Sequence, residues 1–178
     1  MASIALPPLL FSPMQINAFD FVAPMPAYFH STPTSRFYVS STLANNAEDS
    51  NSLKVISNRG VFKHHLEKYF GPLFKHPKCQ LVVKVHIFKG TEECFGELVS
   101  AVSITVLQVG VPLSYFLVGI TLCDAMRMYH LVLRNNCRLI GIFGNGEFDK
   151  KWLEVVEVKC REEVERIRGV LNEVMAKR

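Results

Sequence analysis

The hydrophobic and polar residues of this chain follow regular periods from residue 53 onward, and these periods predict its first elements. A helix with Asn58 as its N-cap and Gly71-Pro72 as its end is predicted by the helical spacing of the apolar residues Val61, Phe62, Leu66, Tyr69 and Phe70. The next segment, 79–89, alternates Leu, Val and Ile with more polar residues. This period of two predicts a strand with one buried face.

The second half of the chain continues with a helix, three strands and a final helix. The run from residue 90 to 109 is almost uncharged and precedes Gly110-Val111-Pro112, which predicts a buried helix and its end. Three strands are expected over 115–123, 128–135 and 137–145, with Asn135-Asn136 as a turn. Residues 148–178 predict an amphipathic helix with the apolar stripe Trp152, Val155, Val156, Cys160, Val164, Ile167, Val170, Leu171 and Val174. This order predicts an α+β fold, a small sheet with helices packed on one face.

Residues 1–52 differ in composition from the rest of the chain. They are rich in Pro, Ser, Thr and Asn and show no sustained period, so they are predicted to be a disordered leader to a domain that spans 53–178. The segment begins Met-Ala-Ser, is rich in hydroxyl residues and has almost no acid before Glu48, which is the composition of an organelle transit peptide. A plastid or mitochondrial address therefore stays open beside the disordered leader.

The overall composition bounds the class of protein. A chain of 178 residues with 49% hydrophobic and 20% charged residues is ordinary for one globular domain with a sizeable core. Lys and Arg outnumber Asp and Glu by 20 to 16, which permits contact with nucleic acid or an anionic surface. The five cysteines are widely spaced and include no Cys-x-x-Cys pair, so neither a disulfide framework nor a zinc site is expected.

The uncharged stretch from Leu98 to Leu122 allows a second class of protein, because it is longer than the ~20 residues that a transmembrane helix needs. Gly110 and Pro112 lie in its middle, and several polar residues are spread along it. Both features favour two globular elements, a buried helix and a strand. A small organellar membrane protein anchored by residues 98–122 is the alternative.

Three segments resemble the RNase PH family. The segment "GVPLSYFLVGITL", which follows an apolar helix, resembles the family's core, where such a helix runs into Gly-Ile-Pro or Gly-Val-Pro and a strand. The segment "LEKYFGPLFKHPKCQLVVKVHIFKG" resembles the preceding helix, proline-containing link and strand, and residues 131–167 resemble the late strands, glycine turn and C-terminal helix. The resemblance covers residues 59–178 and is strongest to the RNase PH-like subunits of the eukaryotic exosome core ring. It implies an RNase PH-like, or ribosomal S5 domain 2-like, α+β fold.

The turn before the buried helix departs from the family's phosphate-binding pattern. In phosphorolytic members an Asp-Gly-Gly-Thr-Arg turn contributes to the phosphate site, since glycines, a helix N-terminus and an arginine all favour an oxyanion. The matching positions here are Thr91, Glu92, Glu93, Cys94 and Phe95, and the two carboxylates would repel phosphate. The resemblance therefore implies a non-catalytic subunit and argues against an active phosphorolytic exoribonuclease.

Two further departures concern the extent of the fold. The family's N-terminal half has no evident counterpart in residues 1–52, so a partial domain is expected. The segment that carries a catalytic aspartate in active members is much shorter here, and only Asp124 lies near it. No catalytic residue is expected.

The resemblance implies a subunit of an exosome-type complex that processes and degrades RNA in the nucleus and cytoplasm. Such a subunit would scaffold a ring with other RNase PH-like subunits and help to line a channel for single-stranded RNA. Basic side chains around the first helix, Arg59, Lys63, Lys75 and Lys78, are the predicted contacts to RNA phosphates. No cofactor or metal is expected, because the adjacent His64 and His65 point in different directions on a helix.

Overall fold

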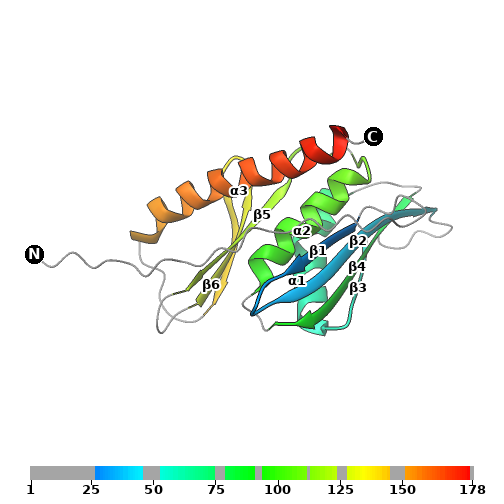
Figure 1. Cartoon of the computed structure of the whole chain (residues 1–178), viewed down its shortest axis with the longest axis horizontal. Coiled ribbons are helices and arrows are strands. Elements are labelled where there is room, and N and C mark those ends of the chain that lie inside the picture. The colour runs from blue at the N-terminus through cyan, green and yellow to red at the C-terminus, as the bar shows by residue number, and fades with distance from the viewer. Residues whose placement is uncertain are drawn as a thin grey trace, which may run out of the picture.

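The computed structural model describes residues 27–45, 53–74, 79–90, 94–111, 113–123, 128–144 and 151–176. In these ranges, seven strands form two sheets and three α-helices pack against them (Figure 1). The strands are β1 (Ala27–Ser31), β2 (Arg36–Asn45), β3 (Leu53–Ser57), β4 (Cys79–Lys89), β5 (Leu117–Cys123), β6 (Met128–Arg134) and β7 (Leu139–Gly144). The helices are α1 (Gly60–Phe70), α2 (Phe95–Gln108) and α3 (Lys151–Ala176), with the short 3₁₀ helix η1 (Gly71–Leu73) after α1.

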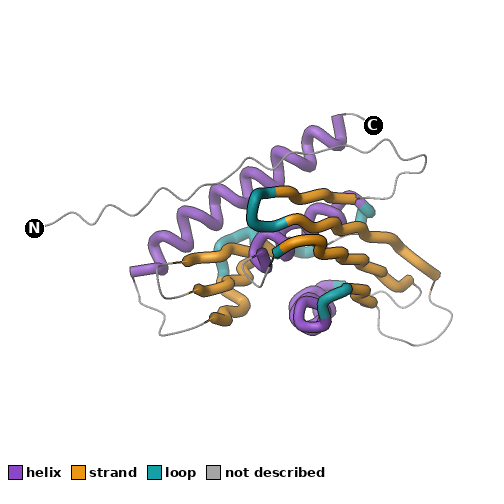
Figure 2. Tube along the Cα trace, turned by 60° about the horizontal axis from the view of Figure 1, so that its bottom comes forward, coloured by secondary structure: helices purple, strands orange, loops and turns teal. Residues whose placement is uncertain are grey.

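The first sheet has the strand order β1-β2-β4-β3, and the second has the order β5-β6-β7. All neighbouring strands are antiparallel except β3 and β4, which are parallel and are connected through α1. A parallel pair needs such a crossover, and a helix is its usual form. The two sheets lie apart, with α2 between them (Figures 1 and 2).

The position of α2 explains why its sequence is apolar on every side. The helix packs against β2 and β1 of the first sheet and against β5 and β6 of the second, so nearly all of its residues are buried. A helix buried all round carries no polar face. Its buried Thr105 hydroxyl lies 2.7 Å from the Ser41 hydroxyl of β2, so this buried polar group is paired.

Serine side chains of α2 bind the backbone of β5. The Ser103 hydroxyl donates to the carbonyl of Leu117 at 2.6 Å and accepts from its N–H at 3.2 Å. One turn earlier, the Ser100 hydroxyl accepts from the Gly119 N–H at 3.1 Å. These bonds need a close approach of helix and strand, and a Cβ on Gly119 would lie 2.2 Å from the carbonyl oxygen of Gly96.

The first and last helices bury one face each. Phe62, Leu66 and Phe70 of α1 are buried, and α3 buries Val156, Cys160, Val164, Ile167 and Val170 of the predicted stripe. The amphipathic pattern of α3 is thus confirmed. None of the five cysteines forms a disulfide bond in the described residues.

The predicted α+β class is confirmed, but the single sheet and the disordered leader up to residue 52 are corrected. Residues 27–45 contain β1 and β2; β1 pairs with β2, and β2 pairs with β4 over ten residues. Phe37 and Val39 are fully buried, so these strands are part of the domain core. Residues 1–26 and 46–52 lie outside the described residues, so the predicted transit peptide stays a prediction.

Asn58 does not cap α1 as predicted. Its side-chain amide donates to the carbonyl of Ile87 at 2.9 Å and accepts from the Ile87 N–H at 3.0 Å. The amide thus continues the pairing of β3 with β4 by one residue, and Arg59 stands at the N-cap without a side-chain hydrogen bond. The side chain of an Asn that precedes a helix can bond either to the helix N-terminus or to a neighbouring strand, and here it bonds to the strand.

The alternative of a membrane anchor at residues 98–122 is wrong for this fold. The first part of this stretch lies in α2 and the last part in β5, and both are buried in the protein core. Among the helices that the structure describes, none is both long enough and apolar enough to span a bilayer.

Candidate functional site at the N-terminus of helix α2

The N-terminus of α2 is the place where the RNase PH resemblance puts a phosphate site. Cys94 occupies the N-cap, makes no capping hydrogen bond through its side chain and is 2% exposed. Phe95, at the position of the family's arginine, is 1% exposed. Thr91, Glu92 and Glu93 lie outside the described residues. The described part of this N-terminus is therefore closed by apolar side chains.

Protein groups use the backbone donors at this helix end. The Gly96 N–H donates to the Thr121 hydroxyl of β5 at 3.2 Å. The Glu97 carboxylate accepts from its own backbone N–H, which favours the charged form. Burial is the larger effect and raises the pKa of Glu97 to about 6. Free N–H groups are what make a helix N-terminus bind anions, and two of them are occupied here.

Aromatic and histidine rings fill the space beside this helix end. The Phe95 ring lies 4.8 Å from that of Phe143 on β7 and 5.8 Å from that of Phe62 on α1. His65 stacks on Phe143 at 4.7 Å, and His130 of β6 lies 4.9 Å from the same ring. Such packing stabilises a core and surrounds this helix end with aromatic rings.

His130 is held as a neutral ring. Its Nδ1 lies 3.1 Å from the Thr121 hydroxyl, and the side chain is 3% exposed. Burial, with a smaller effect from His65, lowers the pKa of His130 to about 4. Thr121 thus connects the first turn of α2 with His130, and this arrangement orders the core.

A second group of polar residues lies between α2, α3 and β1, with Tyr28 and His30 buried and Glu163 and Arg166 half-buried. Burial alone would lower the pKa of Arg166, but its ion pair with Glu163, with an Nε–Oε2 distance of 2.7 Å, raises it above the usual value. Burial also raises the pKa of Tyr28 to about 12, and the neighbouring Arg166 opposes this change. His30 stacks on Phe37 at 4.5 Å, and burial, followed by Arg166, lowers its pKa to about 4. These residues come from β1, β2 and α3, so the charges of this group affect how the elements pack.

Replacement of Glu97 by glutamine is expected to stabilise the chain above pH 6. The raised pKa means that the folded state holds a proton that the unfolded state loses between about pH 4.5 and 6, so ionisation of Glu97 costs stability as pH rises through this window. The variant should match the wild type near pH 4.5 and exceed it by ~2 kcal/mol at pH 7.

Urea denaturation of both proteins across this pH range measures the difference. Glu162→Gln, on the exposed side of α3, is the matched control and should change stability by less than ~0.5 kcal/mol. A constant difference between Glu97→Gln and the wild type at every pH would contradict the expectation.

The structure places the predicted RNA contacts only in part. Arg59 and Lys63 are exposed at the start of α1, and Lys63 lies 4.0 Å from Glu67 in an exposed ion pair. Lys75, Lys78 and Asp124 lie outside the described residues. RNA contact by the four basic side chains therefore stays a prediction. Among the described residues, no cluster of three or more His, Cys, Asp or Glu side chains could hold a metal ion.

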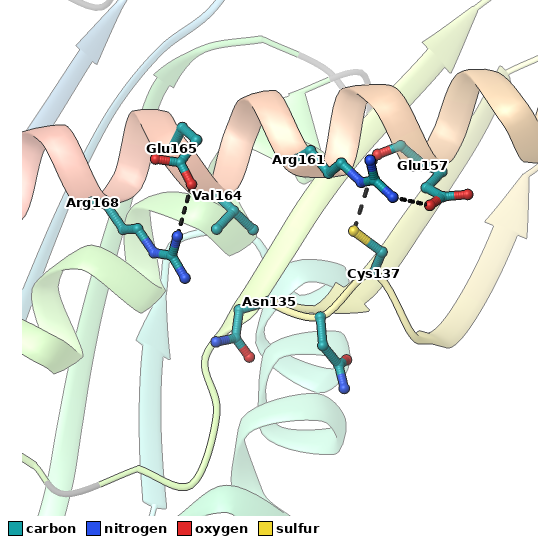
Figure 3. Close-up of a pocket in the computed structure, with 8 residues that line it drawn as sticks. Asn135, Cys137, Glu157, Arg161, Val164, Glu165 and Arg168 are labelled. Carbon is teal, nitrogen blue, oxygen red and sulfur yellow. Dashed lines mark hydrogen bonds and ion pairs between the residues drawn. The ribbon is translucent and has the colours of Figure 1, made fainter.

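A groove of about 460 Å³ lies between α3 and the turn from β6 to β7 (Figure 3). Two exposed ion pairs line it, Arg161 with Glu157 and Arg168 with Glu165 at 2.7 Å. Cys137 of the turn lies 4.0 Å, from sulfur to oxygen, from the Glu157 carbonyl. Since each arginine faces a glutamate, the groove has no excess charge that would select an anion.

No model of a known protein family matches this sequence, and no curated protein sequence is similar enough to count as a relative. Solved structures are similar in fold. Their common class is the RNase PH-like exosome subunit, and this chain has the same fold. Rice (Oryza sativa) Rrp46 aligns with a TM-score of 0.67 at 12% identity, over 82% of this chain and 88% of its own.

Two archaeal structures extend this comparison. A chain of an archaeal exosome core aligns with a TM-score of 0.55 at 9% identity, over 80% of this chain and 81% of its own. A chain of the Archaeoglobus fulgidus exosome with RNA bound to the active site aligns with a TM-score of 0.51 at 8% identity, over 87% and 85%. The expectation that the fold's N-terminal half has no counterpart is therefore wrong, since β1 and β2 precede residue 53 and the alignments cover more than 53–178.

Proposed function

We propose that this chain is a non-catalytic, RNase PH-like subunit of an exosome-type complex, in which it scaffolds a ring with other RNase PH-like subunits. The closed N-terminus of α2 carries the proposal. Phe95 and Cys94 are buried at that helix end, Thr121 takes one backbone donor, and the Glu97 carboxylate takes another. A phosphate ion would have to displace this packing and lie beside a carboxylate.

The similarity of fold supports the choice of partners. Two of the similar chains come from exosome assemblies, and the RNase PH-like fold is common to both. A fold shared at low identity does not fix an activity, so the role depends on the residues at the site. A nuclear and cytoplasmic location goes with this role.

Co-expression of the full chain with RNase PH-like subunits is expected to give a soluble heteromer of fixed stoichiometry. Size-exclusion chromatography with light scattering measures its mass. The purified heteromer, built with a partner that is itself inactive, should release no nucleoside diphosphate from oligoadenylate and inorganic phosphate. Failure to pair with any such subunit would contradict the scaffold role, and phosphate-dependent release of nucleoside diphosphates would contradict the non-catalytic role.

A further inference from the structure

The face of the first sheet that points away from α2 carries a row of aromatic rings. Phe29, Tyr38 and His86 are direct neighbours across β1, β2 and β4. Phe88, two residues after His86, is 58% exposed, and its ring lies 4.6 Å from that of His86 and 6.4 Å from that of Phe29. Alternation along the strands puts Phe29, Tyr38 and His86 on one face, opposite the buried side chains of Phe37, Val39, Val85 and Ile87. Phe88 stands at a bulge of β4, and its contacts with the rings of Phe29 and His86 place it on the same face.

The same face is basic. Lys84 follows the aromatic row at its next position along β4, and Lys54 of β3 pairs with Val82 one step further. Arg36 and Lys89 lie at the other end of the aromatic row, where they are paired in register. None of the residues in β1, β2, β3 and β4 is Asp or Glu. Glu92 and Glu93 follow Lys89 in the sequence, outside the described residues.

In this row the rings of His86 and Phe88 are exposed and those of Phe29 and Tyr38 are half-buried. Aromatic rings flanked by cations on a sheet surface suit one kind of ligand. Unpaired bases stack on aromatic rings, and the phosphates between them attract lysine and arginine. A face without acidic residues favours an anionic partner, and a polyanion gains from every cation on it. Exposed apolar rings of this kind also cost free energy in water unless something covers them.

We propose that this outer face of the first sheet, defined by Phe29, Tyr38, His86, Phe88, Lys54 and Lys84, binds single-stranded RNA by stacking. The proposal deepens the scaffold role and rests on it for the choice of RNA as the natural ligand. It differs from the predicted contacts around α1, since Arg59 and Lys63 lie on another element. Binding by stacking and charge reads no particular sequence.

Fluorescence anisotropy of the full chain with a labelled oligouridine of about 12 nucleotides tests the proposal. The double variant His86→Ala/Phe88→Ala is expected to bind at least tenfold more weakly, because each lost base stack has an effect of that order. Phe88→Tyr should bind as the wild type does, since any aromatic ring can stack. Lys54→Gln/Lys84→Gln should reduce the slope of log affinity against log salt by about 1.4, as expected for two fewer phosphate contacts on a single strand.

Matched controls separate stacking from general loss of apolar surface. Val61→Ala on α1 and Leu153→Ala on α3 remove side chains that are 55% and 51% exposed, and both variants should bind oligouridine as the wild type does. A duplex RNA of the same length should bind at least tenfold more weakly, because its bases are already stacked and paired. Thermal melting checks that each variant remains folded.

Three results would overturn the proposal. One is wild-type affinity in His86→Ala/Phe88→Ala, and another is equal affinity for duplex and single strand. The third is flotation of the chain with anionic phospholipid vesicles without any affinity for oligouridine, which would assign the face to a lipid surface. The mass of the heteromer, measured on the same variants, distinguishes a failure of the RNA-binding proposal from a failure of the scaffold role. If the wild type forms no heteromer, the scaffold role fails, and if only these variants lose it, the face is a subunit interface.

Discussion

Replacement of Gly119 by alanine is expected to destabilise the fold by ~3 kcal/mol or more. The new Cβ would lie 2.2 Å from the Gly96 carbonyl oxygen and 2.7 Å from the Val99 Cβ. The first of these is backbone of α2, which cannot turn aside as a flexible side chain can. The helix would have to move away from β5, which would weaken the hydrogen bonds from Ser100 and Ser103. Urea denaturation of the full chain measures the loss.

Gly169→Ala is the matched control and is expected to have the opposite sign. Gly169 lies on the exposed side of α3, and a Cβ added there meets nothing within 4 Å. Alanine at an exposed helical position stabilises by ~0.5–1 kcal/mol relative to glycine. If both variants change stability in the same direction, the close approach of α2 and β5 does not determine which side chains position 119 tolerates.

Acid is expected to destabilise the chain through two buried histidines. His30 and His130 have pKa values lowered from 6.5 to about 4, so the unfolded chain binds protons in this window that the folded chain does not. Stability is therefore complete above pH 6.5 and is lost as the pH falls towards 4. With partial solvation of the rings allowed for, the pair should cost ~3 kcal/mol or more over the window.

The double variant His30→Gln/His130→Asn tests this loss. Glutamine places an amide near the Nε2 position of His30, which lies 2.8 Å from the Ser35 hydroxyl, and asparagine does the same for Nδ1 of His130. The variant keeps these hydrogen bonds but cannot titrate. Its stability should vary less between pH 6.5 and 4 than that of the wild type. Parallel stability curves for the two proteins would refute the role of these histidines. Glu97 is common to both proteins, so its opposite effect cancels in the comparison.

The helices and the later strands could be predicted because each has one dominant period. Strand β4 is found where the alternation puts it, from Cys79 to Lys89, and the continuous apolar run of α2 reflects burial between two sheets. Strands β1 and β2 could not be predicted, because their inner face includes the polar side chains His30 and Ser41. Ser41 is fully buried against Thr105 of α2, a contact between residues 64 positions apart in the sequence. A hydroxyl residue that suggests a disordered leader in the sequence is thus a core residue, and its hydrogen-bond partner is distant in the sequence.

The candidate site was predictable in part. The departure from the family's phosphate-binding pattern is visible in the sequence at Glu92, Glu93 and Phe95. The contacts of this helix end with Thr121 and with aromatic rings from three other elements depend on tertiary packing. The aromatic and basic face of the first sheet was missed for a similar reason. His86 and Lys84 stand in the alternation of β4, but Phe29 and Tyr38 come from strands that the sequence did not reveal.

The serine contacts of α2 decide which edge of the second sheet can pair with a further strand. A strand from another chain needs free N–H and C=O groups along an edge, and on β5 the groups of Leu117 and Gly119 are already bonded to Ser103 and Ser100. The opposite edge, β7, pairs with no further strand among those described, and its Leu139, Ile140 and Ile142 are 42%, 39% and 40% exposed. A neighbouring chain can therefore lengthen this sheet at β7, and two copies joined through their β7 strands would be related by a two-fold axis, with both open edges used in that one contact.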